Sequence, residues 1–250
     1  MTLSFSLSKS RSHRARQLAV CFVFDGKKNN LSTSSSIDAR FSKRITQLIQ
    51  RKTFTPSLGA CFLIDDASSE GVLVVGLGKP NKYSINNLRA AAGSAARYLR
   101  SHRFAQIAVD GLSELESNDI SESDLFQVIC EGAALGDYQF TRYQAEKAEE
   151  RAKYSADWQL ISANRKRNHD ELKAAIQRGQ SIANGMNWAR DLANTPGNDL
   201  LPADIVAEAK AKFKAHSSIK VEVIDAATAK KKGMNAFLGV AQGSDAPPSM

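Results

Sequence analysis

The four histidines are the first candidates for a metal or acid–base site, because histidine is the commonest metal ligand and titrates near neutral pH. They are His13, His102, His169 and His216. None stands four residues from another, and no HExxH string places two of them on one helix face. No GxSxG string supplies a serine nucleophile either. Their neighbours are basic residues or expected helix ends, so we predict histidines on the surface.

Two short strings stand at the ends of apolar runs. Gly76-Leu77-Gly78 lacks the third glycine of GxGxxG, and Pro80 follows at once. We expect there a tight strand-to-loop turn that uses the backbone freedom of glycine, not a phosphate loop. Asp65-Asp66 is the only adjacent carboxylate pair after a predicted strand, and a solvated turn is its commoner role. The sequence therefore predicts no catalytic, cofactor-binding or metal-ligating residue of its own.

The three cysteines are Cys21, Cys61 and Cys130, far apart and without CxxC spacing. Cys21 and Cys61 lie inside apolar runs that read as strands, so we expect buried, inert thiols. An odd, unpatterned number of cysteines fits a reducing compartment.

The composition is that of a globular domain, with 42% hydrophobic and 24% charged residues. No apolar run approaches the roughly 18 residues that cross a bilayer, so no membrane partner is expected. The formal net charge of +8 is spread along the chain, without an arginine-rich tract or a basic-aromatic platform. A solvated basic face is favoured, and nucleic-acid binding stays open as the alternative.

The first residues are basic and contain no acid up to Arg16, a bias typical of transit peptides. However, Leu3, Phe5 and Leu7 alternate with serines, which is a strand pattern. We expect an edge strand followed by a basic turn, and hence a cytoplasmic protein.

Strands and helices alternate over the first two thirds of the chain. Apolar runs predict buried strands at 18–24, 60–64 and 72–75 and further strands at 105–109 and 158–161. Helical spacing predicts helices over 37–48, 85–99, 122–140 and 168–193, with a loop at 29–36 and caps at Ser84, Ser121 and Asn168. This order predicts an α/β fold: a layered domain with a largely parallel or mixed sheet, covered by helices on both faces.

The chain changes character near residue 145. Residues 142–156 are strongly charged, and the long helix that begins near Asn168 is stopped by Pro196 and Gly197. After it, Pro202 begins a short helix, Ile219 to Ile224 alternates as a strand, and 226–232 is helical. Residues 194–250 are too few for a sizeable core of their own.

Several longer strings occur in a characteristic order. They are Val75 to Lys79 (VGLGK), Leu88 to Gly93 (LRAAAG), Glu131 to Phe140 (EGAALGDYQF), Ala189 to Leu200 (ARDLANTPGNDL), and Gly233-Met234 followed by Val240 to Ser244 (VAQGS). Together they resemble the leucyl aminopeptidase (cytosol aminopeptidase) family over nearly the whole chain. The Asn-Thr-Pro-x-Asn-Asp-Leu string after a long helix is the most specific of them.

The resemblance implies a domain layout. Residues 1–165 resemble the family's non-catalytic, macro-domain-like α/β N-terminal domain, 166–193 its interdomain helix, and 194–250 the beginning of its catalytic domain, an incomplete second α/β domain. It also implies a metalloexopeptidase that removes N-terminal amino acids from peptides. Family members are typically hexamers with two divalent metals, zinc or manganese, which would activate water and polarise the scissile carbonyl.

The same resemblance places the metal ligands beyond these residues. The family's metal-binding lysine, in a Gly-Lys-Gly-x-x-x-Asp-x-Gly-Gly string, should follow roughly two dozen residues after Gln242-Gly243-Ser244, whereas the sequence ends at Met250. We therefore expect a truncated chain that binds no metal and is inactive alone. The alternative is a stand-alone binding or assembly module, which binds nucleic acid through its basic surface or joins full-length aminopeptidase subunits.

Overall fold

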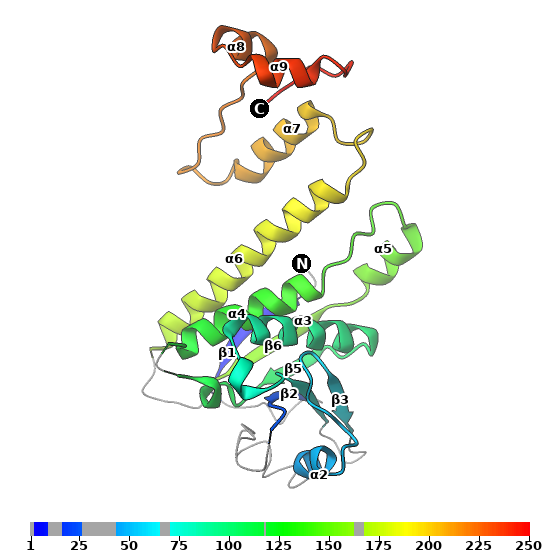
Figure 1. Cartoon of the computed structure of the whole chain (residues 1–250), viewed down its shortest axis with the longest axis vertical. Helices are drawn as coiled ribbons and strands as arrows, with labels where there is room; N and C mark the ends of the chain where they lie inside the picture. Colours follow the sequence, from blue (N-terminus) through cyan, green and yellow to red (C-terminus); the bar gives the residue numbers. More distant parts are fainter. Residues whose placement is uncertain (1–2, 10–16, 27–43, 66–70, 118, 163–167) are drawn as a thin grey trace. The chain divides into compact units, whose positions relative to one another are not determined.

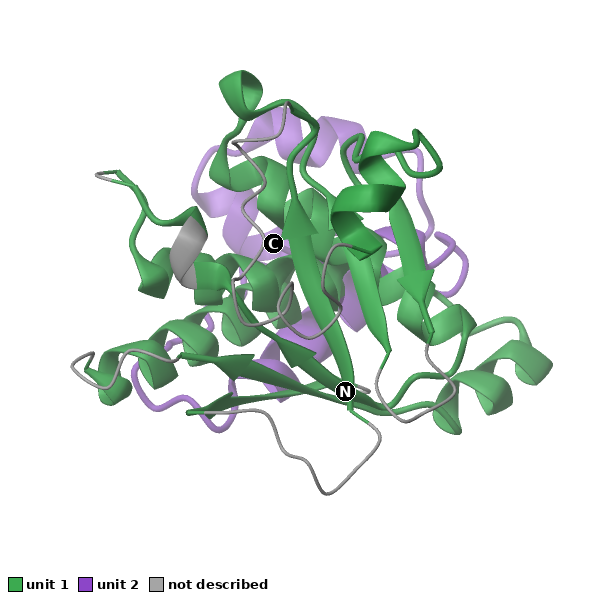
Figure 2. Ribbon diagram, turned by 90° about the horizontal axis from the view of Figure 1, so that it is seen from below, with its two compact units in different colours: residues 1–187 green, residues 188–250 purple. Residues whose placement is uncertain are grey.

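The computed structural model describes residues 3–9, 17–26, 44–65, 71–117, 119–162 and 168–250. The chain divides into two compact units, residues 1–187 and 188–250, which are coloured separately in Figure 2. The predicted loop at 29–36, the first part of the helix predicted over 37–48, His13 and Asp66 lie outside the described residues.

A six-stranded sheet forms the centre of the first unit. Its strands are β1 (Leu3–Ser8), β2 (Leu18–Val23), β3 (Cys61–Ile64), β4 (Val72–Gly76), β5 (Gln106–Val109) and β6 (Ala156–Ile161). They lie in the order β1-β6-β5-β2-β4-β3, and all neighbours are parallel except β3, which runs antiparallel to β4. The predicted mixed sheet is confirmed, as is β1 as an edge strand.

Both faces of the central strands are buried, which explains their unbroken apolar runs. Along β2, Val20 and Phe22 pack into one cluster, while Cys21 and Val23 face a second cluster on the other side. The larger cluster includes residues of α3 (Ile85–Ser101), α4 (Glu122–Gly136) and α6 (His169–Asn194); Ile45 of α2 (Arg44–Gln50) belongs to the second. Figure 1 shows α3 and α4 on one side of the strands and α2 on the other.

The strand predicted at residues 60–64 is present as β3, but the prediction that it is buried was wrong. Cys61, Phe62 and Leu63 of β3 are only half-buried, and Ile64 alone is buried. The reason is position: β3 is the last strand of the sheet and has a single neighbour, β4. Short apolar runs do not distinguish a central strand from an edge strand.

The predicted caps begin the helices where expected. The Ser121 hydroxyl accepts a hydrogen bond from the amide of Asp124, whose carboxylate accepts one from the amide of Ser121. The Ser121 hydroxyl also donates to this carboxylate at 2.7 Å, and this bond, followed by the one from the Ser121 amide, lowers the pKa of Asp124. Ser84 is the N-cap of α3, and the Asn168 side chain accepts the amide N–H of Asp170 at the start of α6.

Small residues let three helices approach closely within the first unit. A methyl carbon added to Gly132 of α4 would lie 2.9 Å from the carbonyl carbon of Arg89 on α3. One added to Gly179 of α6 would lie 2.9 Å from Cβ of Cys130 on α4. The alanine-rich face predicted for residues 85–99 therefore packs against both the sheet and α4.

The charged stretch 142–156 contains a short helix, α5 (Ala145–Ala152), with no buried residue. Two 3-10 turns, η1 (Pro80–Lys82) and η2 (Leu112–Leu115), complete the described elements of the first unit. The residues of α5 are mostly charged, and the sequence offered no apolar stripe from which to predict this helix.

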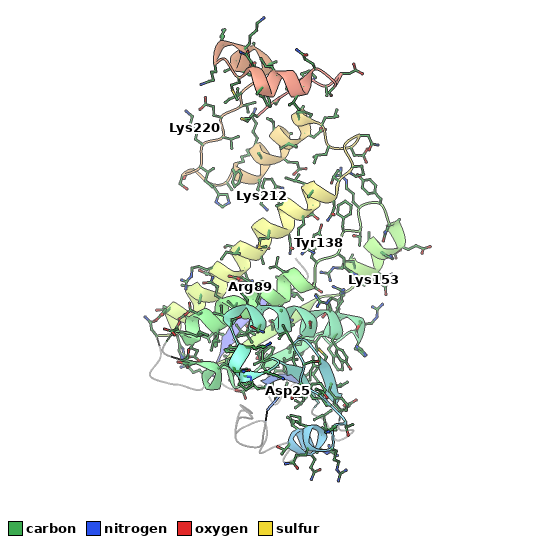
Figure 3. The ribbon with its side chains drawn as sticks, in the orientation of Figure 1. Asp25, Arg89, Tyr138, Lys153, Lys212 and Lys220 are labelled. Carbon is green, nitrogen blue, oxygen red and sulfur yellow. The ribbon has the colours of Figure 1, made fainter. Side chains whose placement is uncertain are left out.

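The second unit contains three short helices, α7 (Pro202–Phe213), α8 (Ala226–Lys231) and α9 (Asn235–Ala241), after the end of α6. The rings of Trp188 and Phe213 meet edge to face, with centroids 5.9 Å apart, and Nζ of Lys212 lies 5.7 Å from the Trp188 centroid. Between α7 and α8 runs the segment that carries Lys220 (Figure 3).

The strand predicted over Ile219–Ile224 is absent from the second unit, all of which is described. Ile224 exchanges two backbone hydrogen bonds with Met250, of 2.7 and 3.0 Å, next to an isolated bridge between Asp225 and Ser249. A strand is defined by its partner, and these residues have only this one pairing. No helix in the described part of the chain is long and apolar enough to cross a membrane.

Candidate functional site

The structure does not bring the described histidines together. The His102 ring stacks on Tyr98 at the end of α3, with centroids 4.1 Å apart. His169 begins α6, and His216 lies against Phe213 in the second unit. Across the described ranges, no group of three histidine, cysteine, aspartate or glutamate side chains is arranged to hold a metal ion. Asp65 is exposed after β3, in keeping with a solvated turn.

The Gly76-Leu77-Gly78 string forms a turn whose amide groups are already used. Their N–H groups donate to the carbonyl oxygens of Ala60, Val23 and Pro56, respectively. Gly78 adopts a φ of 75°, and a methyl carbon on Gly76 would lie 2.7 Å from the Pro56 oxygen. Glycine is needed here for its conformation and for close packing, and no N–H of the three points at a ligand.

Two of the three thiols are buried, as predicted, and the third is not fully so. Cys21 and Cys130 are buried, while Cys61 on the edge strand is half-buried. Burial nevertheless raises the pKa of Cys61 to about 11, and burial also raises the pKa of Cys130. A thiol with a raised pKa holds little thiolate near neutral pH, so neither cysteine is an activated nucleophile.

The string from Asn194 to Leu200 ends α6 and turns the chain. The Thr195 hydroxyl donates to the carbonyl oxygen of Asp191 at 2.7 Å, which closes the last helical turn. The amide of Asp199 then donates to the carbonyl oxygen of Pro196 at 2.9 Å. Thr195 is 8% exposed, and these hydrogen bonds fix the turn between α6 and α7 within the second unit.

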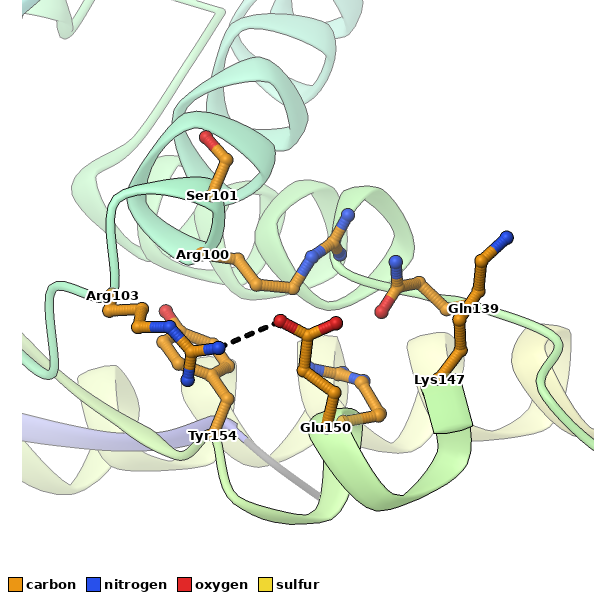
Figure 4. A pocket seen from close by; sticks show the side chains of 8 residues that line it. Arg100, Ser101, Arg103, Gln139, Lys147, Glu150 and Tyr154 are labelled. Atoms are coloured by element: carbon orange, nitrogen blue, oxygen red, sulfur yellow. Dashed lines mark hydrogen bonds and ion pairs between the residues drawn. The ribbon is translucent and has the colours of Figure 1, made fainter. Parts of the chain in front are cut away.

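A basic pocket of about 280 Å³ lies in the first unit, between the end of α3, the loop after α4, and α5 (Figure 4). We call it the basic pocket; it is lined by Arg100, Ser101, Arg103, Gln139, Lys147, Glu150, Arg151 and Tyr154. Nothing in the sequence pattern predicts this pocket. Its cations come from two segments more than forty residues apart, and only the fold brings these together.

The side chain of Asp137, 3% exposed, holds two of the guanidinium groups. Nη1 of Arg100 donates to its carbonyl oxygen at 2.7 Å and to its carboxylate at 3.1 Å, and Arg151 forms an ion pair with the same carboxylate. The Tyr154 hydroxyl donates to the carbonyl oxygen of Phe104, and burial, with Asp137 nearby, raises its pKa to about 12. On the rim, Arg103 and Glu150 form a 2.7 Å ion pair.

Comparison with protein families assigns both parts of the chain. Residues 20–147 match the N-terminal domain of the cytosol aminopeptidase family, and residues 187–250 match its catalytic domain. The chain belongs to the cytosol aminopeptidase family. The start of the catalytic-domain match falls beside the division between the two compact units at residues 187 and 188.

Curated relatives agree with this assignment. A probable cytosol aminopeptidase of Pseudomonas syringae pv. tomato is 32% identical over 225 residues, covering 88% of this chain and 44% of the relative. One from Azotobacter vinelandii is 30% identical over 246 residues, covering 97% of this chain and 49% of the relative. The chain thus spans about half the length of the cytosol aminopeptidases it matches.

Solved structures show the same fold at lower identity. A tomato leucine aminopeptidase mutant matches 99% of this chain and 49% of its own, with a TM-score of 0.78 and 19% identity. The bottromycin maturation enzyme BotP in complex with Mn matches 94% of this chain and 44% of its own, with a TM-score of 0.68 and 20% identity. The α/β architecture predicted from the sequence is therefore that of leucine aminopeptidase-like folds.

Proposed function

We propose that these 250 residues form the N-terminal portion of a leucyl aminopeptidase-like metalloexopeptidase that removes N-terminal amino acids from peptides. The observation that carries the proposal is the order of the two family matches, N-terminal domain before catalytic domain, along one chain. Within it we propose a non-catalytic domain over residues 1–165, an interdomain helix over 166–193, and the beginning of the catalytic domain over 194–250, in a cytoplasmic protein.

Two divalent metals, manganese or zinc, are the cofactors that we propose for the complete enzyme, and the Mn in the BotP structure supports this choice. The residues described here do not fit such a centre, because they contain no group of three suitable ligands. We therefore assign no catalytic step to a residue of this chain. The metal-binding half would lie outside these residues, and the chain alone would be inactive.

The test is an assay of the purified 250-residue chain with a leucyl anilide and added Mn²⁺ or Zn²⁺. We expect no release of leucine above the rate with metal alone, while a full-length relative such as the Pseudomonas syringae protein hydrolyses the same substrate. Leucine release in proportion to the concentration of the 250-residue chain would refute inactivity. If the full-length relative also failed to hydrolyse leucyl anilides, the aminopeptidase proposal itself would be wrong.

A second candidate function, association with aminopeptidase subunits, is favoured by the apolar surface of the second unit. The exposed fractions are 43% for Leu201, 46% for Ile205 and 87% for Val240. Leu201 and Ile205 stand four residues apart at the start of α7, so they share one face of that helix, and neighbouring exposed apolar side chains often mark a contact surface. Copurification of the tagged chain with a full-length aminopeptidase would support association, and monomeric behaviour in a mixture of the two would exclude it.

Nucleic-acid binding through the net charge of +8 is the remaining alternative. If phosphates are the target, binding to duplex DNA should weaken steeply between low and physiological salt. A chain that does not shift duplex DNA even at low salt would remove this alternative.

A further inference from the structure

The walls of the basic pocket carry more positive than negative charge. Arg100, Arg103, Lys147 and Arg151 carry four positive charges, and Glu150 on the rim and Asp137 beneath carry two negative ones, so this set has a formal excess of two positive charges. The excess is local, and its cations come from the end of α3 and from α5. It sits on a concave surface, where the field of neighbouring cations adds up.

Two of these cations are held in place before any ligand arrives. The Asp137 carboxylate binds both Arg100 and Arg151, whose side chains are 19% and 16% exposed. A single buried carboxylate cannot neutralise two guanidinium groups. Side chains that are already ordered lose little conformational entropy on binding a ligand, so the floor of the pocket is suited to receive an anion.

Several N–H groups of the pocket's cations are also available to donate hydrogen bonds to a ligand. Among the described residues, Arg100 donates only through Nη1, and Arg103 only through Nη2 to Glu150. Lys147 lines the pocket and has no ion pair with any described residue. Guanidinium groups bind the oxygens of phosphate in pairs, and a lysine adds a point charge.

We propose that the basic pocket binds a phosphate dianion, either inorganic phosphate or the phosphomonoester group of a small molecule. Its two negative charges match the formal excess of the walls, and a volume of about 280 Å³ suits a small ligand. The phosphate would take donors of Arg100, Arg103 and Lys147 and displace the Glu150 carboxylate toward solvent. This displacement is inexpensive, because Arg103 and Glu150 are 62% and 66% exposed and such surface pairs contribute little.

The test is calorimetric titration of inorganic phosphate into the 250-residue chain, with ionic strength held constant by sodium chloride. We expect saturable binding at one site, about tenfold weaker in Arg103→Ala and in Lys147→Ala, because each removes a charged donor. Glu150→Gln should bind phosphate several-fold more tightly, since it removes the competing carboxylate. A gain of affinity cannot arise from a failure to fold.

Lys153→Ala is the matched control. Lys153, at the end of α5 (Figure 3), carries the same charge but pairs with Glu149 and is not among the residues that line the pocket. Its substitution should leave phosphate affinity unchanged.

The proposal is overturned if binding does not saturate, if Lys153→Ala weakens binding as much as Lys147→Ala, or if Glu150→Gln does not tighten phosphate binding. Glycerol phosphate that binds more tightly than inorganic phosphate would identify a phosphomonoester as the ligand; equal or weaker binding would identify free phosphate.

Discussion

Arg89 of α3 lies against Gly132 of α4 so closely that a methyl carbon on the glycine would stand 2.9 Å from the arginine carbonyl carbon. The same methyl would lie 3.0 Å from Cβ of Ala92. Because the first neighbour is backbone, it cannot move aside as a flexible side chain would. We expect Gly132→Ala to lower the free energy of unfolding by about 1–3 kcal/mol through overpacking, measured by urea denaturation.

Gly185→Ala is the control for this prediction. Gly185 also lies inside a helix, α6, but a methyl carbon there would meet no atom within 4 Å among the described residues. Alanine is the better helix former, so this change should raise stability by up to about 1 kcal/mol. Equal effects of the two substitutions would show that the close approach of α3 and α4 does not limit stability.

Asp137 offers a second test, because its side chain is almost fully buried between two arginines. Asp137→Ala would leave Arg100 and Arg151 without their shared carboxylate, and we expect it to cost about 3 kcal/mol of unfolding free energy. Glu149→Ala, which breaks only the exposed pair with Lys153, should cost less than about 0.5 kcal/mol. A neutral Asp137→Ala variant would mean that the two guanidinium groups find water or other partners.

The central strands could be predicted from the sequence because burial on both faces leaves an unbroken apolar run. Leu18–Val23 and Val72–Gly76 are such runs, and the structure places both in the middle of the sheet. The helices that begin after Ser84 and Ser121 could be predicted as well, since their caps and apolar spacing agree. These signals come from residues that are close together in the sequence, so they can be recognised before the fold is known.

The features that sequence analysis missed depend on distant partners. The direction and exposure of β3 follow from its place beyond β4, and the loss of a strand at Ile219–Ile224 follows from the lack of a neighbour. The basic pocket needs Asp137 to draw Arg100 and Arg151 together across the loop after α4. Neither residue type nor spacing indicates that these side chains lie close together before the order of the strands is known.

Alkaline pH should destabilise the first unit. Burial raises the pKa of Cys61 from 9.0 to about 11, and burial raises those of Tyr83 and Tyr154 from 10.0 to about 12. In each case the folded protein favours the neutral form of the side chain. The resulting stabilisation is complete at pH values below the pKa in the unfolded chain, and it is lost as the pH rises through the pKa in the folded protein. The melting temperature should therefore fall between about pH 9 and 12.

Tyr83→Phe separates this mechanism from general alkaline damage. The Tyr83 hydroxyl is buried and has no hydrogen-bond partner among the described residues, so removing it should not reduce stability at neutral pH. With one titrating group fewer, the variant should lose less stability than the parent chain above pH 10. Parallel melting curves for both proteins across the whole range would contradict the assignment.

The second unit should be cut first by protease, because burial within it is sparse. Of residues 188–250, only Thr195 and Ala229 are less than 9% exposed. Resistance to proteolysis reflects the free energy of local opening, which is small where few apolar contacts are buried.

Brief trypsin treatment should cleave after Lys214 or Lys220, between α7 and α8, before it cleaves within residues 1–187. Intact-mass spectrometry identifies the first cut, and Lys220→Gln should move it to Lys214. First cuts after Arg89 or Lys153 would show instead that the first unit opens more readily than its buried sheet indicates.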